Sequence, residues 1–369
     1  MNAIMPVPLD EYPVHQTPLS LARVATSDRN FYDRYYFNAF DPAGDAMLIT
    51  GFGVYPNLGV VDAFATVRHG DTQRSVRFSD ALTSRDLTTA VGGYRIEVIE
   101  PLRQLRVVCE HEDLGFDLTW TGAHPAVQEQ PHLILSGTRP IIEASRFAQL
   151  GSWAGTLAVD GRDITVDPAA WTGSRDRSWG IRPSGEPEPP GRAAAEGAGG
   201  FWWLYAPLRF DDFAIVVIVQ EEPDGTRTLN NAVRIWHDGR KEQLGWPRMH
   251  WTYEPGTRHP KSVRLDMTTP DGKPLEVEIE SRPGIALHVG CGYGPDPDWT
   301  HGRWMGRDWS LSSSYDLTDP AIIARTPYGV IDHIGYARCG DAEGWGLFEH
   351  ASMGRHDPTG FADWSSVAP

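Results

Sequence analysis

Turn-forming Asp-Gly pairs beside short runs of strand-forming residues are the feature of this sequence that most restricts its fold. The pairs occupy positions 160–161, 224–225, 238–239 and 271–272. Asp and Gly tolerate the positive φ angles of tight hairpin turns, so such a pair between two strands is typical of an antiparallel hairpin. Strand-forming runs recur about every 8–12 residues, as in all-β folds. The sequence therefore predicts antiparallel meanders with little helix.

Alternation of apolar and polar residues defines the individual strands. It is regular over 275–280, where three apolar residues alternate with three glutamates and predict a half-exposed strand. The longest apolar run, 213–219, predicts a buried strand and is too short to span a membrane. Asp319 and Pro320 predict the start of one short helix. We expect strands over 47–54, 60–67, 94–99, 104–110, 115–121, 213–220, 233–237, 262–267, 275–280, 331–339 and 345–350.

The length of the chain bears on its domain organisation. Its 369 residues are more than one ordinary core needs, which favours two β-domains or one large double-sheeted body. We predict an N-terminal extension over 1–24, an N-terminal β-domain over 25–170 and a C-terminal β-domain over 171–369. Over 183–200 the composition changes to Pro, Gly, Ala and Glu, which predicts a mobile loop within the second domain.

The charge balance and the cysteines argue against several classes of partner. Asp and Glu number 49 against 33 Lys and Arg, and the net charge of -16 repels nucleic acid and anionic membrane surfaces. The three widely spaced cysteines, Cys109, Cys291 and Cys339, predict buried thiols in a reducing compartment. The N-terminus shows no secretory signal. We therefore expect a cytoplasmic protein with no integral membrane segment and no nucleic-acid partner.

Motifs for cofactors and metals do not occur in the sequence. There is no His-Glu-x-x-His or Cys-x-x-Cys spacing and no Gly-x-Ser-x-Gly elbow, and the glycine-rich run 290–294 predicts a turn instead of a phosphate-binding loop. We expect no cofactor and no structural zinc. A metal site made of residues dispersed along the chain stays open.

The densest polar and aromatic run is Arg175-Asp176-Arg177-Ser178-Trp179-Gly180. Together with Gln149-Leu150-Gly151-Ser152-Trp153-Ala154-Gly155, Gly306-Arg307-Asp308-Trp309-Ser310-Leu311 and the stretch 55–64, it resembles the carotenoid 1,2-hydratase (hydroxyneurosporene synthase)-like and AttH-like proteins. This resemblance implies tandem lipocalin-like (calycin-type) antiparallel β-barrel or sandwich domains.

The resemblance also implies a function. The expected ligand is a hydrophobic isoprenoid-, steroid- or polyketide-like molecule in a β-barrel cavity. The expected chemistry is cofactor-independent acid/base catalysis: hydration or dehydration, isomerisation or cyclisation. Two alternatives stay open, a non-catalytic lipid or terpenoid carrier and an oligomerising scaffold without a cavity; a homodimer is compatible with each. An ionisable group inside the cavity would favour the enzyme, whereas polar groups at the rim alone would favour the carrier.

Asp176 and His237 are the first two candidates for proton transfer. Asp176 is either a cavity acid or a structural ion-paired group, because Arg175 and Arg177 flank it and would lower its pKa. His237 follows a predicted strand and either projects into the cavity or lies at a solvated strand end beside the Asp-Gly turn.

Glu349 is the third candidate. In 345–350, alternation places Glu349 on the face opposite His350, so it reaches the cavity if Trp345 and Leu347 do. A carboxyl group beside Trp has the raised pKa of a general acid, although ionisable strand ends are usually solvated. Asp332 shares a face with Ile334 and Tyr336, either inside the cavity or at the surface. The aromatic residues that we predict to line the cavity are Trp179, Trp202, Trp203, Trp236 and Tyr336.

Overall fold

The computed structural model of the chain describes residues 11–13, 24–83, 88–188, 200–294, 296–326 and 329–369. Nearly all of its regular structure is β-strand, which confirms the predicted all-β class. The short α1 (Pro320–Ile323) begins at the N-cap Asp319 with Pro320 in its first turn, as predicted. A 3₁₀ turn covers Asp357–Thr359. The strands are β1 (Phe31–Phe40), β2 (Ala46–Tyr55), β3 (Val60–His69), β4 (Thr72–Ala81), β5 (Ala90–Val91), β6 (Tyr94–Glu100), β7 (Gln104–Cys109), β8 (Leu114–Gly122), β9 (Val127–Gln128), β10 (His132–Ser136), β11 (Arg139–Val159), β12 (Arg162–Val166), β13 (Thr172–Ile181), β14 (Gly200–Phe210), β15 (Phe213–Glu221), β16 (Arg227–Trp236), β17 (Lys241–Gln243), β18 (Arg248–Tyr253), β19 (Pro260–Thr268), β20 (Pro274–Ala286), β21 (Trp309–Asp316), β22 (Gly329–Cys339) and β23 (Ala342–Gly354).

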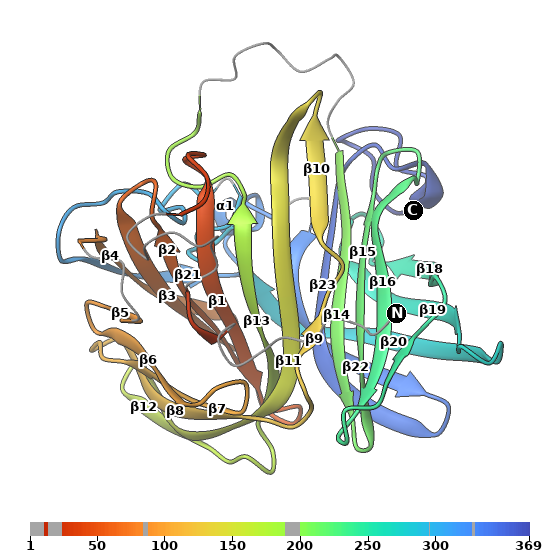
Figure 1. Ribbon diagram of the computed structural model, residues 1–369, viewed down its shortest axis with the longest axis horizontal. Coiled ribbons are helices and arrows are strands. Elements are labelled where there is room, and N and C mark those ends of the chain that lie inside the picture. Colours follow the sequence, from red (N-terminus) through yellow and green to blue (C-terminus); the bar gives the residue numbers. More distant parts are fainter. Residues whose placement is uncertain (1–10, 14–23, 84–87, 189–199, 295, 327–328) are drawn as a thin grey trace.

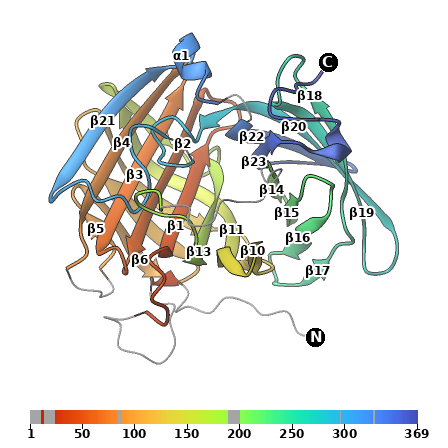
Figure 2. The same ribbon diagram turned by 90° about the horizontal axis from the view of Figure 1, so that it is seen from above.

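Two curled antiparallel sheets make up the molecule (Figures 1 and 2). The first has the strand order β21-β4-β3-β2-β1-β13-β11-β8-β7-β6-β5, and β9, β10 and β12 also pair with the long β11. The second has the order β17-β16-β15-β14-β23-β22-β20-β19-β18. In Figure 1 they form two curved bodies that meet where β11 and β13 lie close to β14 and β23.

Both faces of the central strands are buried, which explains their near-continuous apolar sequences. In β1 all ten residues are buried. Tyr35 and Phe37 point to the core of the first sheet, whereas Tyr36 and Phe40 point to a core shared with the second sheet. Because successive side chains of a strand point to opposite faces, one strand serves both cores. The other face of the second sheet packs a third core around Trp202 and Leu204.

The sequence-based strand and hairpin predictions agree with this architecture. Every predicted strand overlaps a strand of the structure, and each Asp-Gly pair connects two paired antiparallel strands. Val277 and Ile279 are buried as the alternation predicts, and all three cysteines are buried free thiols. The densely polar and aromatic run around Asp176 forms β13. On one face of this strand Arg175 and Arg177 pair with Glu11 and Asp33, and the other face borders the cavity described below.

Sheet membership follows the chain order only in part. Strands β13 and β21 lie within the range predicted for the second domain, but they pair with β1 and β4 in the first sheet. The division into domains over 25–170 and 171–369 stays a prediction. Of the predicted mobile loop over 183–200, residues 189–199 lie outside the described residues, as does most of the predicted extension over 1–24. Among the described residues, none of the helices has the length and hydropathy that a bilayer span needs.

Candidate functional site

A cavity of about 250 Å³ lies between the two sheets. This location corrects the expectation of a ligand chamber inside one barrel. The inner face of the first sheet is filled by aromatic side chains such as Trp120 and Trp153, and that of the second by Trp202 and Phe348. The cavity instead interrupts the shared core. It is lined by Tyr32, Arg34, Tyr36, Glu129, Gln130, His132, Ile142, Ala144, Arg146, Asp176, Ser178, Arg182, Phe201, Trp203, Tyr205, Ile218, Leu287, His288, Tyr293, Gly294, Val330, Asp332, Leu347, Glu349 and Met353.

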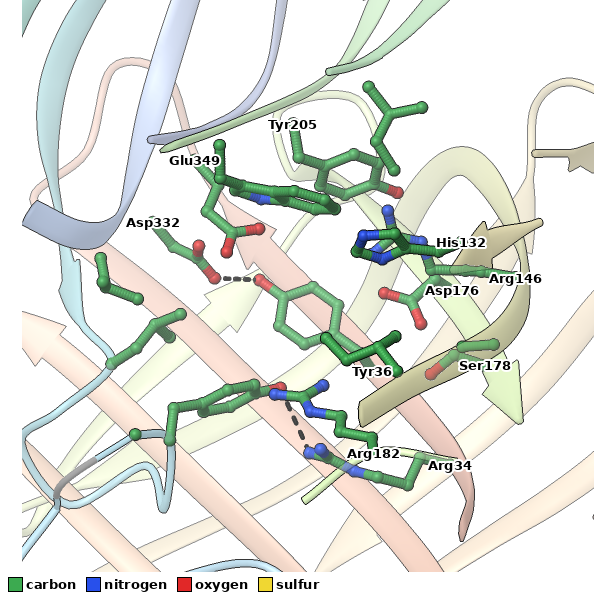
Figure 3. A pocket seen from close by; sticks show the side chains of 18 of the residues that line it. Arg34, Tyr36, His132, Arg146, Asp176, Ser178, Arg182, Tyr205, Asp332 and Glu349 are labelled. Carbon is green, nitrogen blue, oxygen red and sulfur yellow. Dashed lines mark hydrogen bonds between the residues drawn. The ribbon is translucent and has the colours of Figure 1, made fainter. Parts of the chain in front are cut away.

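The wall formed by the first sheet consists of cross-strand rows on β1, β13 and β11. Asp176 is the cross-strand partner of both Tyr36 and Ala148. Two residues along, Ser178 is the partner of both Arg34 and Arg146. Side chains two residues apart on a strand share a face, so both rows point into the cavity. Figure 3 shows the polar groups of these rows pointing toward the second sheet.

The wall formed by the second sheet contributes two carboxyl groups side by side. Asp332 on β22 and Glu349 on β23 are direct cross-strand partners, and Tyr205 on β14 is the partner of Glu349 on its other side. The Tyr36 hydroxyl donates a hydrogen bond of 2.5 Å to Asp332 Oδ2, and this bond joins the two sheets across the cavity (Figure 3). The site therefore combines an acid pair on one sheet with a phenol from the other.

Burial raises the pKa of both carboxyl groups in the acid pair. The pKa of Asp332 lies well above its usual range because the group is buried and because Glu349 is beside it; the Tyr36 hydrogen bond opposes this rise. The pKa of Glu349 is raised mainly by burial, and Arg146 opposes the rise. Two carboxylates opposite each other in a low-dielectric site cannot both ionise without a large repulsion. One proton is therefore retained by the pair to a higher pH than an isolated carboxyl group would allow.

Another acid of the cavity wall, Glu129, is ion-paired. Glu129 accepts a hydrogen bond of 2.6 Å from Arg146 Nε, and burial raises its pKa to about 7 although Arg146 lowers it. The Arg146 guanidinium lies over the rings of Tyr205 at 4.2 Å and Trp203 at 5.4 Å. His132 stacks on Trp203, and burial lowers its pKa to about 4, so this imidazole is neutral near pH 7.

Asp176 occupies the cavity as one of its two interpretations predicted, and its arginine neighbours do not pair with it. Arg175 Nη1 lies 2.5 Å from Glu11 Oε1, and Arg177 Nη2 lies 2.6 Å from Asp33 Oδ1, all on the opposite face of β13. The expected lowering of the Asp176 pKa is therefore wrong in sign. Burial raises that pKa, against the opposing effects of several arginines.

His237 lies outside the cavity, so the interpretation that it projects into the cavity is wrong. It is exposed at the end of β16, where its two ring nitrogens lie 2.7 Å and 2.8 Å from the carbonyl oxygens of Ala123 and Asp211. It also stacks on His124. Two carbonyl acceptors favour the doubly protonated ring and raise its pKa. His237 therefore links loops of the two sheets, because the strand ends before its side chain can turn inward.

Of the five aromatic residues predicted to line the cavity, Trp203 does. Trp202 points to the other face of β14 and packs on His356, since adjacent residues of a strand face opposite ways. Trp236 lies under the Arg240 guanidinium at 3.9 Å, near the turn. Tyr336 is on the face of Asp332 but four residues further along β22, where it packs on Trp345. Trp179 is half-buried on β13 and is not among the cavity-lining residues.

Several cavity residues gave no sequence signal that we could use. Tyr36 and Arg34 lie in an aromatic run whose alternation is hidden because both faces are buried. Arg146 and Glu129 belong to the long β11 and to the segment before β10, which carry no strand pattern by themselves. Asp332 was placed on the right face by alternation, and only the packing of the sheets decides that this face borders the cavity. Within the described ranges, no three His, Cys, Asp or Glu side chains gather in an arrangement that could hold a metal ion.

Known proteins are similar to this two-sheet chain either in sequence or in fold. The sequence profile of a family of unknown function, DUF8625, matches residues 7–362. The chain belongs to this family. Among curated proteins, no sequence matches it. The family has no assigned activity, so the function of this DUF8625 member must be inferred from its site.

Solved structures with the same fold share little sequence with this DUF8625 chain. Kievitone hydratase from Nectria haematococca is 13% identical, with a TM-score of 0.51 over 96% of this chain and 98% of that one. A putative AttH from Nitrosomonas europaea is 12% identical, with a TM-score of 0.52 over 92% and 98%. CghA is 12% identical, with a TM-score of 0.52 over 88% of each chain. At such identities the likeness shows the fold alone. The resemblance to AttH-like proteins is confirmed at that level, and the resemblance to carotenoid 1,2-hydratase stays a prediction.

Proposed function

We propose that this protein is an enzyme that binds a hydrophobic small molecule between its two sheets and transfers protons to and from it without a cofactor. The observation that carries the proposal is the Asp332–Glu349 pair, two adjacent carboxyl groups surrounded by protein in the wall of a partly apolar cavity. A retained proton beside a second carboxyl group provides an acid and a base within reach of one ligand.

The carrier and scaffold alternatives fit these observations less well. A scaffold needs no cavity. A carrier needs apolar walls with polar groups at the rim, whereas here Asp332, Asp176 and Glu129 are all buried in the cavity wall. Burying an ionisable group costs stability unless it is paired, and Asp332 keeps one unpartnered oxygen, Oδ1. Strongly perturbed acids in a cavity are more typical of catalytic sites than of carrier sites.

The geometry suggests how the proton transfers proceed. In a hydration, water adds to one alkene carbon and gives a proton to the carboxylate of Glu349. The alkene π electrons move to the other carbon and form the new C–H bond there with the proton of Asp332, so no free carbocation is needed. Dehydration is the reverse, and an isomerisation returns a carbon-bound proton to the acid pair without water. Tyr36 positions the Asp332 carboxyl group through its hydrogen bond.

The charged groups of the cavity favour some of these reactions over others. Arg146 already lies over one face of Trp203 and one face of Tyr205, so those two faces are not open to a carbocation for cation–π attraction. Three arginines, Arg34, Arg146 and Arg182, border the same space. Positive groups disfavour a free carbocation and stabilise negative charge that develops on an oxygen. The site therefore suits an alkene or a C–H bond activated by a neighbouring carbonyl group.

Proton exchange in heavy water tests the proposal directly. The full chain is incubated with isoprenoid, steroid and polyketide ketones, and each ketone is then analysed by mass spectrometry for deuterium at carbon or for added water. We expect incorporation that depends on the protein and falls by at least about 100-fold in Asp332→Asn, the size of a lost general-acid contribution. The matched control is Asp271→Asn, because Asp271 lies on an exposed turn.

The outcomes separate the alternatives. Incorporation that is lost in Asp332→Asn and kept in Asp271→Asn supports the enzyme. Ketones that bind in the cavity of the wild-type protein and leave it unlabelled would support the carrier instead. Incorporation that is equal in Asp332→Asn and in the wild type would remove the acid pair from the mechanism.

A further inference from the structure

Two guanidinium groups border the cavity without a carboxylate partner. Arg34 on β1 is buried, and its Nη2 donates to the Tyr293 hydroxyl at 3.2 Å and to His301 Nε2 at 2.9 Å. Arg182 follows β13, is half-buried, and contacts the ring of Tyr293 at 5.3 Å. Arg34 lies 5.2 Å from the same ring, so the two cations flank one tyrosine (Figure 3 shows their guanidinium groups near each other).

No carboxylate of the described residues lies within ion-pair distance of either guanidinium, in contrast to Arg146, Arg175 and Arg177. Each of these three arginines has an acidic partner within 2.6 Å. Asp176 interacts electrostatically with both Arg34 and Arg182, and the buried Asp62 interacts with Arg34, but neither carboxyl group forms an ion pair with them among the described residues. Two arginines that cannot lose their charge and lie close together repel each other unless an anion joins them.

A buried histidine beside the two arginines is affected by their positive charge. The pKa of His301 lies well below its usual range because of burial and because of Arg34 and Arg182. Its Nε2 accepts the hydrogen bond from Arg34, so the ring is neutral and does not compete for an anion. Next to Tyr293, Gly294 has a φ of +57°, and a Cβ there would lie 2.5 Å from His288 Nε2, so this position favours glycine.

From these contacts we infer that Arg34 and Arg182 form a subsite for a carboxylate group, and that the substrate is an apolar molecule ending in a carboxylate. Guanidinium groups match the planar carboxylate with paired hydrogen bonds. The acid pair lies across Tyr36 from this subsite, so an anchored carboxylate would leave the apolar part of the substrate facing Asp332 and Glu349 (Figure 3). This inference rests on the proposed function for the role of that apolar part.

Binding of two matched ligands tests the subsite without requiring turnover. Decanoate and decan-1-ol each have a chain of ten carbon atoms and differ in charge. Each is titrated against the neutral fluorescent probe N-phenyl-1-naphthylamine bound to the full-length protein at neutral pH, and displacement of the probe is measured. We expect Arg182→Gln to weaken decanoate binding about tenfold and to change decan-1-ol binding by less than about twofold. Arg182→Lys, which keeps the charge, should restore part of the decanoate affinity. The control is Arg338→Gln, an arginine paired with Glu278 on the surface.

Equal losses for both ligands in Arg182→Gln, or no binding of decanoate by the wild-type protein, would overturn the subsite. Failure of the subsite and failure of the proposed function are distinguishable. Arg182-dependent decanoate binding without any deuterium exchange on the ketones would leave the subsite and remove the catalysis. Asp332-dependent exchange with no preference for decanoate would leave the catalysis and remove the subsite.

Discussion

The two faces of β13 both carry charged side chains, and the surroundings of those side chains differ. On the face toward the first sheet's own core, Arg175 and Arg177 are fully buried and paired with Glu11 and Asp33. On the face toward the cavity, Asp176 has no ion-pair partner within 4 Å among the described residues, and at the end of the strand Arg182 has none either.

The difference separates structural from functional charge. A buried ion pair with good geometry compensates its own desolvation and holds strands in register. A charged group that borders a cavity and has no ion-pair partner does not stabilise the fold in this way. It remains available to a ligand. In this protein, charged residues that are adjacent in the sequence therefore belong to different functions, and the pairing of each side chain assigns it to one of them.

The largest effect should come from breaking a pair on the core face. Asp33→Asn leaves Arg177 buried without its partner, and we expect the free energy of unfolding to fall by about 3–5 kcal/mol. Denaturant unfolding measures it. Asp176→Asn is the matched variant on the cavity face and should lose less than about 1 kcal/mol, because the acid it replaces is unpaired. Equal losses in both variants would contradict the distinction between the two faces.

The next largest effect should be on the pH dependence of the unfolding free energy. The raised pKa of Asp332 means that the folded chain keeps a proton that the unfolded chain releases, so this group stabilises the fold at low pH and loses that contribution as pH rises. In Asp332→Asn we expect the decline in unfolding free energy between about pH 5 and pH 7 to shrink by on the order of 1 kcal/mol per pH unit. Exposed Asp271→Asn is the control. An unchanged decline in Asp332→Asn would mean that this carboxyl group titrates normally.

Removal of the hydroxyl that bridges the sheets should have a smaller effect. With a ketone that exchanges in heavy water, we expect Tyr36→Phe to slow exchange about tenfold, which corresponds to the loss of one hydrogen bond to the Asp332 carboxyl group. The Tyr36 bond lowers the pKa of Asp332, so its loss should move the fall in rate at high pH to a higher pH. Tyr336→Phe, outside the cavity, should do neither. A slower rate without a shifted pH profile would indicate a structural role for Tyr36 alone.

A surface pair should give the smallest effect. Arg338 lies 2.6 Å from Glu278 on the outer face of the second sheet, and both side chains are about half-exposed. Exposed ion pairs contribute little because water and salt screen them. We expect Arg338→Gln to change the unfolding free energy by less than about 0.5 kcal/mol. A loss as large as that of Asp33→Asn would show that burial does not govern the strength of these pairs.

The sequence by itself determined the strands and much of their connectivity. Alternation over 275–280 and 345–350 assigns each residue to a face from neighbours two positions away, and Asp-Gly turns join strands that pair directly. These signals are local, so one sequence suffices to detect them. The all-β class, the short helix at Pro320 and the common face of Leu347 and Glu349 follow from them.

Only the tertiary structure determines which residues pack against each face of a strand. In β1 and β13 both faces are buried, so alternation cannot tell the core side from the cavity side. Arg177 and Arg182 are both arginines near the same strand, and only the arrival of Asp33 from β1 pairs one of them while the other borders the cavity. The cavity itself forms where two curled sheets pack imperfectly against each other. Its walls come from residues as distant in the chain as Tyr36 and Asp332, and no local pattern records their meeting.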